Sequence, residues 1–475
     1  GTLDGHQVLA APITSMTKAA IADAGLDNKT ADRCKNMFAL GMVYRLFDQP
    51  MDQTIGFFQH KFKKSPTIAE ANIRALKAGH NYVLTMEAVP ATYTVQPAAR
   101  TPGTYRNITG NQALAWGLMA GAKKAGKDLF LGSYPITPAT DIMQELAKHK
   151  WAGVKVLQAE DEIAGICSAI GASFAGDVAV TTTSGPGMAL KTEAIGLAVM
   201  TELPLVIVNV QRGGPSTGLP TKTEQSDLLQ AVWGRNGESP VVVLAASTPA
   251  ACFDRAVEAI KIATEHMTPV ILLSESYVAN GAEPWKVKAL DELPAIHPPV
   301  LTQPDPAWTP YGRDPATLAR KWVVPGTPAL QHRIGGLEKD ECTGCVSHDP
   351  QNHEAMVALR RQKVERVADF IPEQKFRGKG AKKLLVVGWG GQFGTLFGAV
   401  TELRSEGKDI AVTHFNHIHP LPRNTASIFE QFEKIVVCEL NSGQFANYLR
   451  AVLPQFTYLQ YNKVKDRPFK VSELK

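Results

Sequence analysis

The sequence predicts an α/β protein built on a doubly wound parallel sheet. Between residues 107 and 292, short apolar runs alternate with longer segments whose apolar residues recur at helical spacing. The short runs are apolar at nearly every position, which is typical of strands covered by helices on both faces. A second, smaller alternation of the same kind occupies residues 376–475. We therefore expect two sheet domains of this class.

The elements can be assigned in chain order. In the first sheet domain we expect strands at 127–133, 154–160, 177–183, 204–210, 240–246 and 268–276, with helices at 111–126, 139–150, 161–176, 188–202 and 223–234. In the last domain we expect strands at 384–390, 409–418 and 434–440, and helices at 394–407, 424–434 and 445–453. The N-terminal part offers only two clear helices, at 38–47 and 68–79.

Two proline-rich stretches suggest the domain boundaries. One runs from Val89 to Arg106, and the other, from Pro294 to Pro328, holds nine prolines. Such stretches rarely lie inside a packed sheet, so we interpret them as linkers or surface wraps. The predicted organisation is an incomplete N-terminal domain (1–90), a sheet domain (107–292), a linker and wrap (293–375) and a second sheet domain (376–475).

Composition excludes several classes of protein. The net charge is +5, from 50 Lys and Arg against 45 Asp and Glu, without a dense basic run, so nucleic acid is not an expected partner. No run of about 18 apolar residues predicts a membrane span. The N-terminus lacks both a signal-peptide pattern and a starting Met, so we expect a processed or incomplete chain. Six scattered cysteines form no disulfide framework and favour a cytoplasmic location.

The stretch Tyr-Pro-Ile-Thr-Pro, residues 134–138, directly follows a predicted strand. Pro135 and Pro138 fix their own φ angles and favour extended conformations in the residues before them. We therefore expect a rigid, non-helical corner with the Thr137 hydroxyl at its tip. Either the chain only needs a turn here, or a small polar ligand needs a pre-positioned hydrogen bond.

Three further loops follow strands of the same domain, and ligands of doubly wound sheets bind at the carboxyl ends of strands. The acids 160–162 open a helix, where they can simply complement its dipole or can supply one acid/base group. The turn at Ser184-Gly185 lets backbone approach a ligand, or is only tight. Arg212 follows a buried strand, where it needs an anionic ligand or an internal ion pair.

Taken together and in this order, the four loops resemble the α subunit of 2-oxoacid:ferredoxin oxidoreductases, most closely the 2-oxoglutarate type. The motifs are YPITP, QAEDE with a glycine five residues after Glu160, TTSGPG, and NVQRGGPSTGLPTKTEQSD. The resemblance implies a thiamine diphosphate-binding, pyrimidine-type domain around residues 107–290. It also implies a transketolase C-terminal-like domain at the end of the chain and the tail of a γ-type domain at its start.

The resemblance also implies roles for individual residues. Glu160 matches the glutamate that hydrogen bonds the aminopyrimidine ring of thiamine diphosphate, and a carboxylate there stabilises the imino tautomer. Its apolar neighbours Ile163 and Ala164 would exclude water. Thr137 and Arg212 match the residues that bind the 2-oxoacid. The expected cofactor contacts are Glu160, Tyr134, Pro135, Ile136, Ser184 and Gly185, and the expected substrate contacts are Thr137, Arg212, Gly213 and Lys222, the last for a distal carboxylate.

The implied enzyme needs partners. The chain has no GDG motif followed by asparagines and no cysteine cluster, so the diphosphate, Mg²⁺ and a [4Fe-4S] cluster must lie in a β subunit. The family implies an (αβ)2 heterotetramer that decarboxylates 2-oxoglutarate, passes electrons to ferredoxin and forms succinyl-CoA from coenzyme A. The sequence leaves the direction of this reaction open. The alternatives are pyruvate or branched 2-oxoacids as substrates, or a non-catalytic scaffolding subunit.

Two other motifs suggest different chemistry. Residues 388–394, GWGGQFG, follow a strand like a dinucleotide fingerprint, but the spacing differs and the next strand lacks the acidic residue that grips a ribose. Cys342, Cys345, His348 and His353 form a Cys-x2-Cys-x2-His-x4-His pattern, whose central loop is too short for a usual zinc site. We therefore expect neither a dehydrogenase nor a metal site in this chain.

Overall fold

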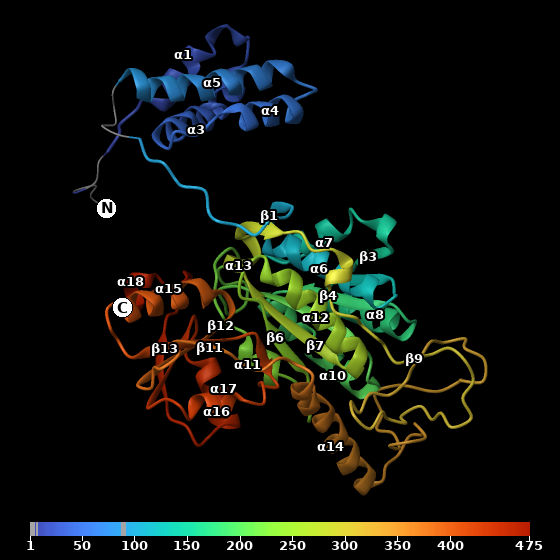
Figure 1. The fold of residues 1–475 in the computed structure, drawn as a ribbon. Helices are drawn as coiled ribbons and strands as arrows, with labels where there is room; N and C mark the ends of the chain where they lie inside the picture. Colours follow the sequence, from blue (N-terminus) through green and yellow to red (C-terminus); the bar gives the residue numbers. More distant parts are fainter. Residues whose placement is uncertain (1–4, 6–7, 87–91) are drawn as a thin grey trace. The chain divides into compact units, whose positions relative to one another are not determined.

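The computed structural model describes residues 5, 8–86 and 92–475, and it divides into two compact units, Gly1–Pro102 and Gly103–Lys475 (Figure 1). Residues 89–91 of the first proline-rich stretch lie outside the described residues. No helix in the described part of the chain is long and apolar enough to cross a bilayer.

The first unit is helical throughout its described regular structure. Its two predicted helices are confirmed as α3 (Lys35–Leu46) and α5 (Pro66–Thr85). Their backbones touch, because a Cβ on Gly41 would overlap the Leu76 carbonyl and one on Gly79 would overlap the Phe38 carbonyl. The other helices are α1 (Ile13–Ala20), η1 (Ala22–Ala24), α2 (Asn28–Arg33) and α4 (Asp52–Lys61).

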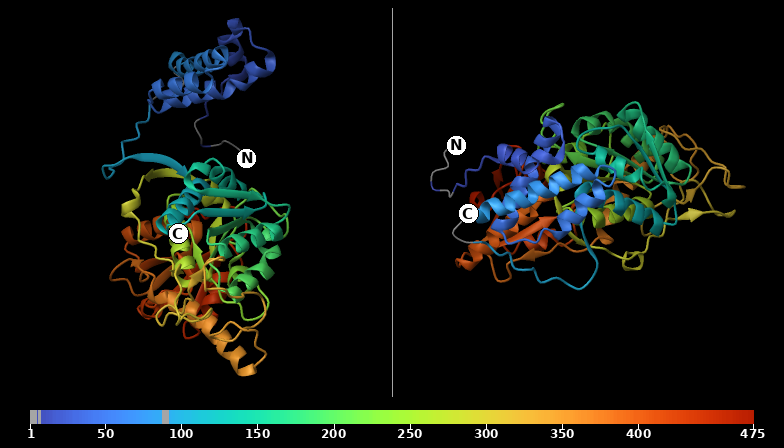
Figure 2. Two further views of the ribbon diagram at one scale, coloured as in Figure 1. Left: turned by 90° about the vertical axis from the view of Figure 1, so that its right-hand side faces the viewer. Right: turned by 90° about the horizontal axis from the view of Figure 1, so that it is seen from above.

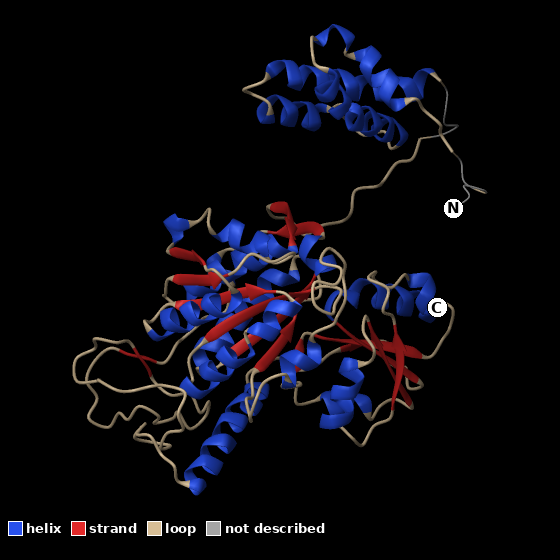
Figure 3. Ribbon diagram, turned by 180° about the vertical axis from the view of Figure 1, so that it is seen from behind, coloured by secondary structure: helices blue, strands red, loops and turns tan. Residues whose placement is uncertain are grey.

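A seven-stranded sheet forms the centre of the second unit, in the order β14-β6-β7-β5-β4-β2-β3 (Figure 3). All neighbouring pairs are parallel except β14 with β6. Every residue of β4, β5 and β7 is buried, as expected for a sheet covered on both faces. The strands are β2 (Leu129–Ser133), β3 (Val154–Gln158), β4 (Val178–Thr183), β5 (Leu205–Gln211), β6 (Val242–Ala245), β7 (Pro269–Glu275) and β14 (His417–His419).

Helices cover both faces of this sheet (Figure 2). Val206 and Val208 face one core with α6 (Gly110–Lys124), α7 (Thr140–Leu146) and α12 (Ala251–His266). Leu205 and Ile207 face the other core with α8 (Glu162–Phe174), α10 (Thr192–Thr201) and α11 (Leu228–Trp233). The sequence analysis missed α12. The helix that the sequence predicts at 223–234 begins only at Leu228, as α11. The helix that it predicts at 188–202 is broken at Lys191, between α9 (Gly185–Leu190) and α10.

The C-terminal sheet has the order β11-β13-β12-β15-β16. The prediction of one strand at 409–418 was wrong. Asn416 interrupts it, exchanging two hydrogen bonds with the Ala245 backbone, so that β14 joins the larger sheet. The elements are β11 (Phe376–Arg377), β12 (Leu384–Trp389), η5 (Gly390–Gln392), α15 (Phe393–Ser405), β13 (Ile410–Phe415), α16 (Thr425–Phe429), β15 (Lys434–Glu439), α17 (Gln444–Val452), β16 (Tyr458–Asn462) and α18 (Val471–Leu474).

Buried residues of the segment 293–375 contact the larger sheet domain, and the segment includes a long helix, α14 (Pro350–Arg366). Glu202, at the end of α10, is 1% exposed and binds Arg313 and Lys363 from this segment. The Trp322 indole donates to the Ser173 carbonyl. The remaining elements are β1 (Tyr105–Thr109), η2 (Lys150–Ala152), α13 (Ser276–Asn280), β8 (Ala282–Lys286), η3 (Leu290–Glu292), β9 (Val300–Leu301), β10 (Trp322–Val323) and η4 (Val367–Asp369).

Candidate functional site

The four predicted loops meet at one edge of the larger sheet. They follow β2, β3, β4 and β5, which are neighbours and parallel, so their carboxyl ends lie together. From β2 the chain moves outward to β3 and then back past β2 to β4. This reversal of strand order opens a crevice between the loops after β2 and β4, the usual place for a ligand in such sheets.

The corner at residues 134–138 is non-helical, as predicted, and α7 begins only at Thr140. The side chains of Tyr134 and Thr137 are exposed, whereas Pro135 and Ile136 are half-buried. The Asn111 amide donates a 2.8 Å hydrogen bond to the Pro138 carbonyl and so ties the corner to α6. The Thr137 hydroxyl is thus presented to solvent from a fixed backbone.

Arg212 joins this corner to the loop after β5. Its Nη1 donates a 2.6 Å hydrogen bond to the Thr137 carbonyl, and its own carbonyl accepts a bond from the Ser226 hydroxyl. The residue is only 7% exposed, and its Nε has no partner among the described residues. Burial lowers the pKa of Arg212, an effect that the more distant Asp227 carboxylate opposes.

The three predicted acidic residues, 160–162, differ in burial and in hydrogen bonding. Asp161 caps α8, accepting from the Ala164 amide at 2.7 Å, and Glu162 is buried. Glu160 is exposed, and within the described part of the chain its carboxylate accepts no hydrogen bond. In this chain by itself Ile163 is half exposed and Ala164 is exposed, so the expectation that they exclude water stays a prediction for the assembled enzyme. Only a second surface over them could exclude water there.

Glycines allow the four loops to touch. A Cβ on Gly165 of α8 would lie 3.1 Å from the Ser133 Cα, just before the corner. One on Gly187 would lie 2.9 Å from the Glu162 Cγ, and one on Gly185 would lie 3.0 Å from the Asp227 carboxylate. The loops therefore form a closed ring, in which Arg212 links the last loop to the first.

The ring carries the remaining predicted residues. Ser184 is buried, with no partner for its hydroxyl among the described residues, and Gly185 starts α9. The Gly213 amide donates to the Lys222 carbonyl, which closes the loop between them. The Lys222 side chain is exposed and makes no hydrogen bond to a described residue. The structure therefore places Lys222 at the rim of the ring.

A cavity of ≈510 Å³ opens beside Arg212. Its walls come from the loops after β4 and β5 and from residues 441–444 of the C-terminal sheet domain. Glu224 lines it and accepts a 3.3 Å bond from the Gly214 amide. Burial and the neighbouring Asp466 raise the pKa of Glu224 to about 7. The cavity thus combines a buried guanidinium with a carboxyl group that titrates near neutrality.

The sequence analysis missed three polar residues at this site: Lys191, Glu224 and Asp227. Lys191 is fully buried and donates to the Glu162 carbonyl at 2.7 Å. Asp227 accepts from the Asn209 amide at 3.0 Å, and its own amide donates to Gln211. The polar run TEQSD, assigned to a helix, was the available signal, because it lies on the connection between a buried strand and the next helix, and acids are rarely packing residues.

The ring fits one half of an aromatic cofactor site. The Glu160 carboxylate is free to accept a hydrogen bond from the aromatic ring of a cofactor. The exposed apolar side chains of Tyr134, Leu157 and Ile163 lie on the adjoining loop, on β3 and at the start of α8. The described residues contain no group of three or more His, Cys, Asp or Glu placed to hold a metal ion. Cys342 and Cys345 are exposed thiols in a turn, and His353 binds Glu338 instead.

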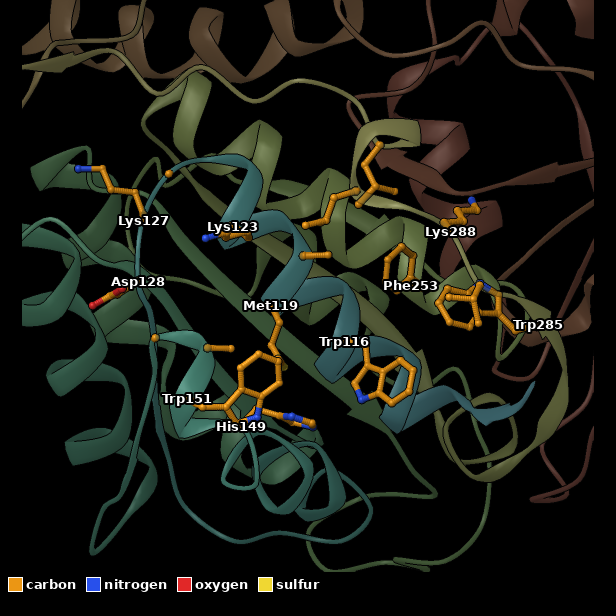
Figure 4. A pocket seen from close by; sticks show the side chains of 17 residues that line it. Trp116, Met119, Lys123, Lys127, Asp128, His149, Trp151, Phe253, Trp285 and Lys288 are labelled. Carbon is orange, nitrogen blue, oxygen red and sulfur yellow. The ribbon is translucent and has the colours of Figure 1, made fainter. Parts of the chain in front are cut away.

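A second cavity, a groove of ≈740 Å³, lies elsewhere (Figure 4). It runs along α6 past Trp116 and Met119 to Lys127 and Gly153, at the amino ends of β2 and β3. None of the predicted site residues, all of which are described, lines it. Convergence of polar groups, rather than cavity size, therefore identifies the functional edge.

The glycine-rich stretch 388–394 has a structural role. A Cβ on Gly391 would overlap the carboxylate of Glu275, and one on Gly390 would lie 2.5 Å from the Gln225 side chain. The loop is therefore filled by the chain itself, where the two sheet domains meet. This geometry leaves no room for a dinucleotide at these glycines.

Comparison with known proteins agrees with the position of the ring. Residues 120–347 match the family described as pyruvate flavodoxin/ferredoxin oxidoreductase, thiamine diphosphate-binding. The 2-oxoglutarate oxidoreductase subunit KorA of Mycobacterium tuberculosis is 48% identical over 95% of this chain and 69% of that protein. The 2-oxoglutarate synthase subunit KorA of Methanocaldococcus jannaschii is 36% identical over 71% of this chain and 88% of that protein.

A solved structure agrees over nearly the whole chain. It is the 2-oxoglutarate:ferredoxin oxidoreductase from Magnetococcus marinus with 2-oxoglutarate, coenzyme A and succinyl-CoA bound. The TM-score is 0.87 at 31% identity, over 96% of this chain and 78% of the other. Fold and sequence therefore agree, and this chain belongs to the family of 2-oxoglutarate:ferredoxin oxidoreductase α subunits, the KorA subunits.

Proposed function

We propose that this chain is the α subunit of a thiamine diphosphate-dependent 2-oxoglutarate:ferredoxin oxidoreductase. The enzyme converts 2-oxoglutarate and coenzyme A to succinyl-CoA and CO2 while it reduces ferredoxin. The Magnetococcus marinus relative, which carries this name, was solved with 2-oxoglutarate, coenzyme A and succinyl-CoA bound. The same site would serve the reverse, carbon-fixing direction.

One observation carries the proposal. The Arg212 guanidinium is buried beside the Thr137 backbone, its Nε is unpaired, and no described carboxylate lies within ion-pair distance. A buried cation without a counter-ion is costly, so the site favours an anionic ligand. A carboxylate can accept two parallel bonds from a guanidinium, which suits a 2-oxoacid.

The other ring residues have complementary roles. The Thr137 hydroxyl, on its rigid corner, donates to the substrate next to Arg212. Lys222, at the rim, would contact the distal carboxylate, and Gly213 lets the substrate approach the backbone. These contacts hold a dicarboxylate by both ends. A smaller 2-oxoacid such as pyruvate lacks the second contact, so we expect it to be a poorer substrate.

Thiamine diphosphate, when bound, supplies the nucleophilic carbon and the electron sink for decarboxylation. This chain would hold its aminopyrimidine ring, with Glu160 accepting a hydrogen bond from the ring and Tyr134, Pro135, Ile136, Ser184 and Gly185 around it. The thiamine diphosphate-binding family matched by residues 120–347 supports this assignment. Burial of Glu160 under a second surface would strengthen its hydrogen bond.

We propose that a β subunit supplies that second surface. Leu157, Ile163 and Tyr134 are 43%, 50% and 38% exposed next to Glu160, and such apolar exposure indicates an interface. The β subunit would carry the diphosphate and Mg²⁺ sites and a [4Fe-4S] cluster that passes electrons to ferredoxin. The assembly would be an (αβ)2 heterotetramer with its active site at the α/β interface.

The test is viologen reduction by the anaerobically purified complex, with coenzyme A and each of 2-oxoglutarate, pyruvate, 2-oxobutyrate and 3-methyl-2-oxobutanoate. We expect reduction that depends on coenzyme A and is fastest with 2-oxoglutarate. Faster reduction with pyruvate or a branched 2-oxoacid would replace the substrate assignment. No reduction by a complex shown to hold thiamine diphosphate and its cluster would favour a scaffolding subunit.

Two variants connect the activity to this chain. Arg212→Met removes a charged hydrogen-bond donor, worth about 1.5–3 kcal/mol, so kcat/KM for 2-oxoglutarate should fall by about 10- to 150-fold. Glu160→Gln should abolish most turnover with the complex still assembled. The matched control is Glu433→Gln, at an exposed position of the C-terminal sheet domain, which should leave activity unchanged. Full activity of both Arg212→Met and Glu160→Gln would refute the assignment.

A further inference from the structure

Lys191 is a buried cation directly behind the loop that carries Glu160. It lies at the break between α9 and α10 and is 0% exposed. We propose that Lys191 is a positioning residue for the cofactor site: its ammonium fixes the 159–162 turn and so holds the Glu160 carboxylate toward the incoming aminopyrimidine ring. This inference rests on the proposed function, because it concerns how Glu160 meets thiamine diphosphate.

The turn from β3 to α8 is held at three points. The Ala159 amide donates to the Ser133 carbonyl at 2.8 Å, and Asp161 caps the Ala164 amide at 2.7 Å. The third point is the Glu162 carbonyl, which accepts from the Lys191 Nζ at 2.7 Å. Glu160 lies within this turn, and no described residue holds its side chain. Its direction is therefore set by the backbone on either side of it.

Packing alone does not explain a lysine at this position. A methionine would fill a similar space without the desolvation penalty of a buried ammonium. Lys191 faces the carboxylates of Asp161 and Glu162 and the Cys167 thiol, all from α8. Its positive charge offsets the repulsion within the acidic run 160–162. The charge thus stabilises a turn in which three acids are consecutive.

The charge of Lys191 is sensitive to pH in an accessible range. Burial lowers the pKa of Lys191 to about 8, although the two carboxylates oppose the shift. The ammonium is therefore present below about pH 8 and lost above it. We expect the affinity for thiamine diphosphate to fall as pH rises from 7 to 9, because the neutral amine no longer offsets the acids. An arginine at 191 would keep its charge throughout this range.

The experiment measures thiamine diphosphate binding to the cofactor-depleted αβ complex by isothermal titration calorimetry at pH 7, 8 and 9. Lys191→Met should bind about 10- to 100-fold more weakly than wild type at pH 7, without a further fall at pH 9. Lys191→Arg should lose less affinity than wild type between pH 7 and 9. The control is Lys408→Met, at an exposed position in the C-terminal sheet domain, which should behave as wild type.

The outcomes separate this inference from the proposed function. If Lys191→Met and Lys191→Arg keep the affinity and pH dependence of wild type, Lys191 has no positioning role, even where Glu160→Gln abolishes turnover. If the wild-type complex binds no thiamine diphosphate, the proposed function itself fails. If the complex with Lys191→Met does not assemble, the pH dependence of thiamine diphosphate affinity in Lys191→Arg tests the inference. A lysine with only a structural role would leave that dependence the same as in wild type.

Discussion

Replacing Glu202 by glutamine should destabilise the larger unit by leaving two buried cations without a counter-ion. Glu202 accepts two hydrogen bonds from Arg313, at 2.5 and 2.6 Å, and another from Lys363. The side chains of Glu202, Arg313 and Lys363 are each exposed by 7% or less. Removing one partner from such a buried group costs about 3–5 kcal/mol. A unit of about 370 residues gains about 0.8 kcal/mol/K of entropy on unfolding, so Tm should fall by about 4–6 °C.

Thermal unfolding of the full chain, followed by circular dichroism, measures this loss. The double variant Glu202→Gln, Lys363→Met removes one of the stranded cations and should be more stable than Glu202→Gln alone. Although burial opposes it, the charges of Lys363 and Arg313 hold the pKa of Glu202 well below its usual range. Wild type should therefore lose this stabilisation as pH falls below about 4, and Glu202→Gln should not. A fall in Tm under 1 °C, or strict additivity of the two changes, would refute the reasoning.

Three other substitutions test the buried contacts. Burial raises the pKa of Glu275 to about 8, so the folded protein keeps this proton while the unfolded chain loses it, and folding stability declines as pH rises from about 4.5 to 8. Glu275→Gln should flatten the decline of Tm over that range, and an unchanged decline would contradict this. Gly41→Ala should destabilise the helical unit in urea by about 1–3 kcal/mol, because its Cβ would overlap the Leu76 carbonyl. Gly56→Ala in α4, with open space around it, should instead stabilise by about 0.5–1 kcal/mol, and equal effects at both glycines would be inconsistent with the close crossing.

The strands were predictable because most of them are short runs that are apolar at nearly every position. Every expected strand of the larger sheet overlaps an observed one. The missed helix, α12, lies between two such runs, and its alanines and charges gave a weaker pattern than the strands. The helix expected at 223–234 forms only from Leu228 onward, and residues 223–227 are not helical for a different reason. Gln225 bonds the Trp389 carbonyl and the Leu440 amide of the second sheet domain, so tertiary contacts override local helix propensity.

The site could be predicted in part. The position of each loop after a strand followed from the pattern, and the resemblance supplied the candidate roles. The contact between Arg212 and Thr137 could not be predicted, because it joins residues 75 positions apart and depends on strand order. Lys191 could not be found either, since nothing in a helical Ala-Leu-Lys-Thr-Glu run shows that its lysine is buried. Burial of a charge is a property of the fold and not of the local sequence.

The pairing of β14 with β6 has a consequence for biosynthesis. β6 ends at Ala245, whereas β14, the strand that covers its outer edge, begins at His417. During translation this edge therefore stays uncovered until most of the chain has been synthesised. An uncovered edge strand is a template for association with other chains. Fragments that end before β14 should aggregate, however well their own residues match the sheet.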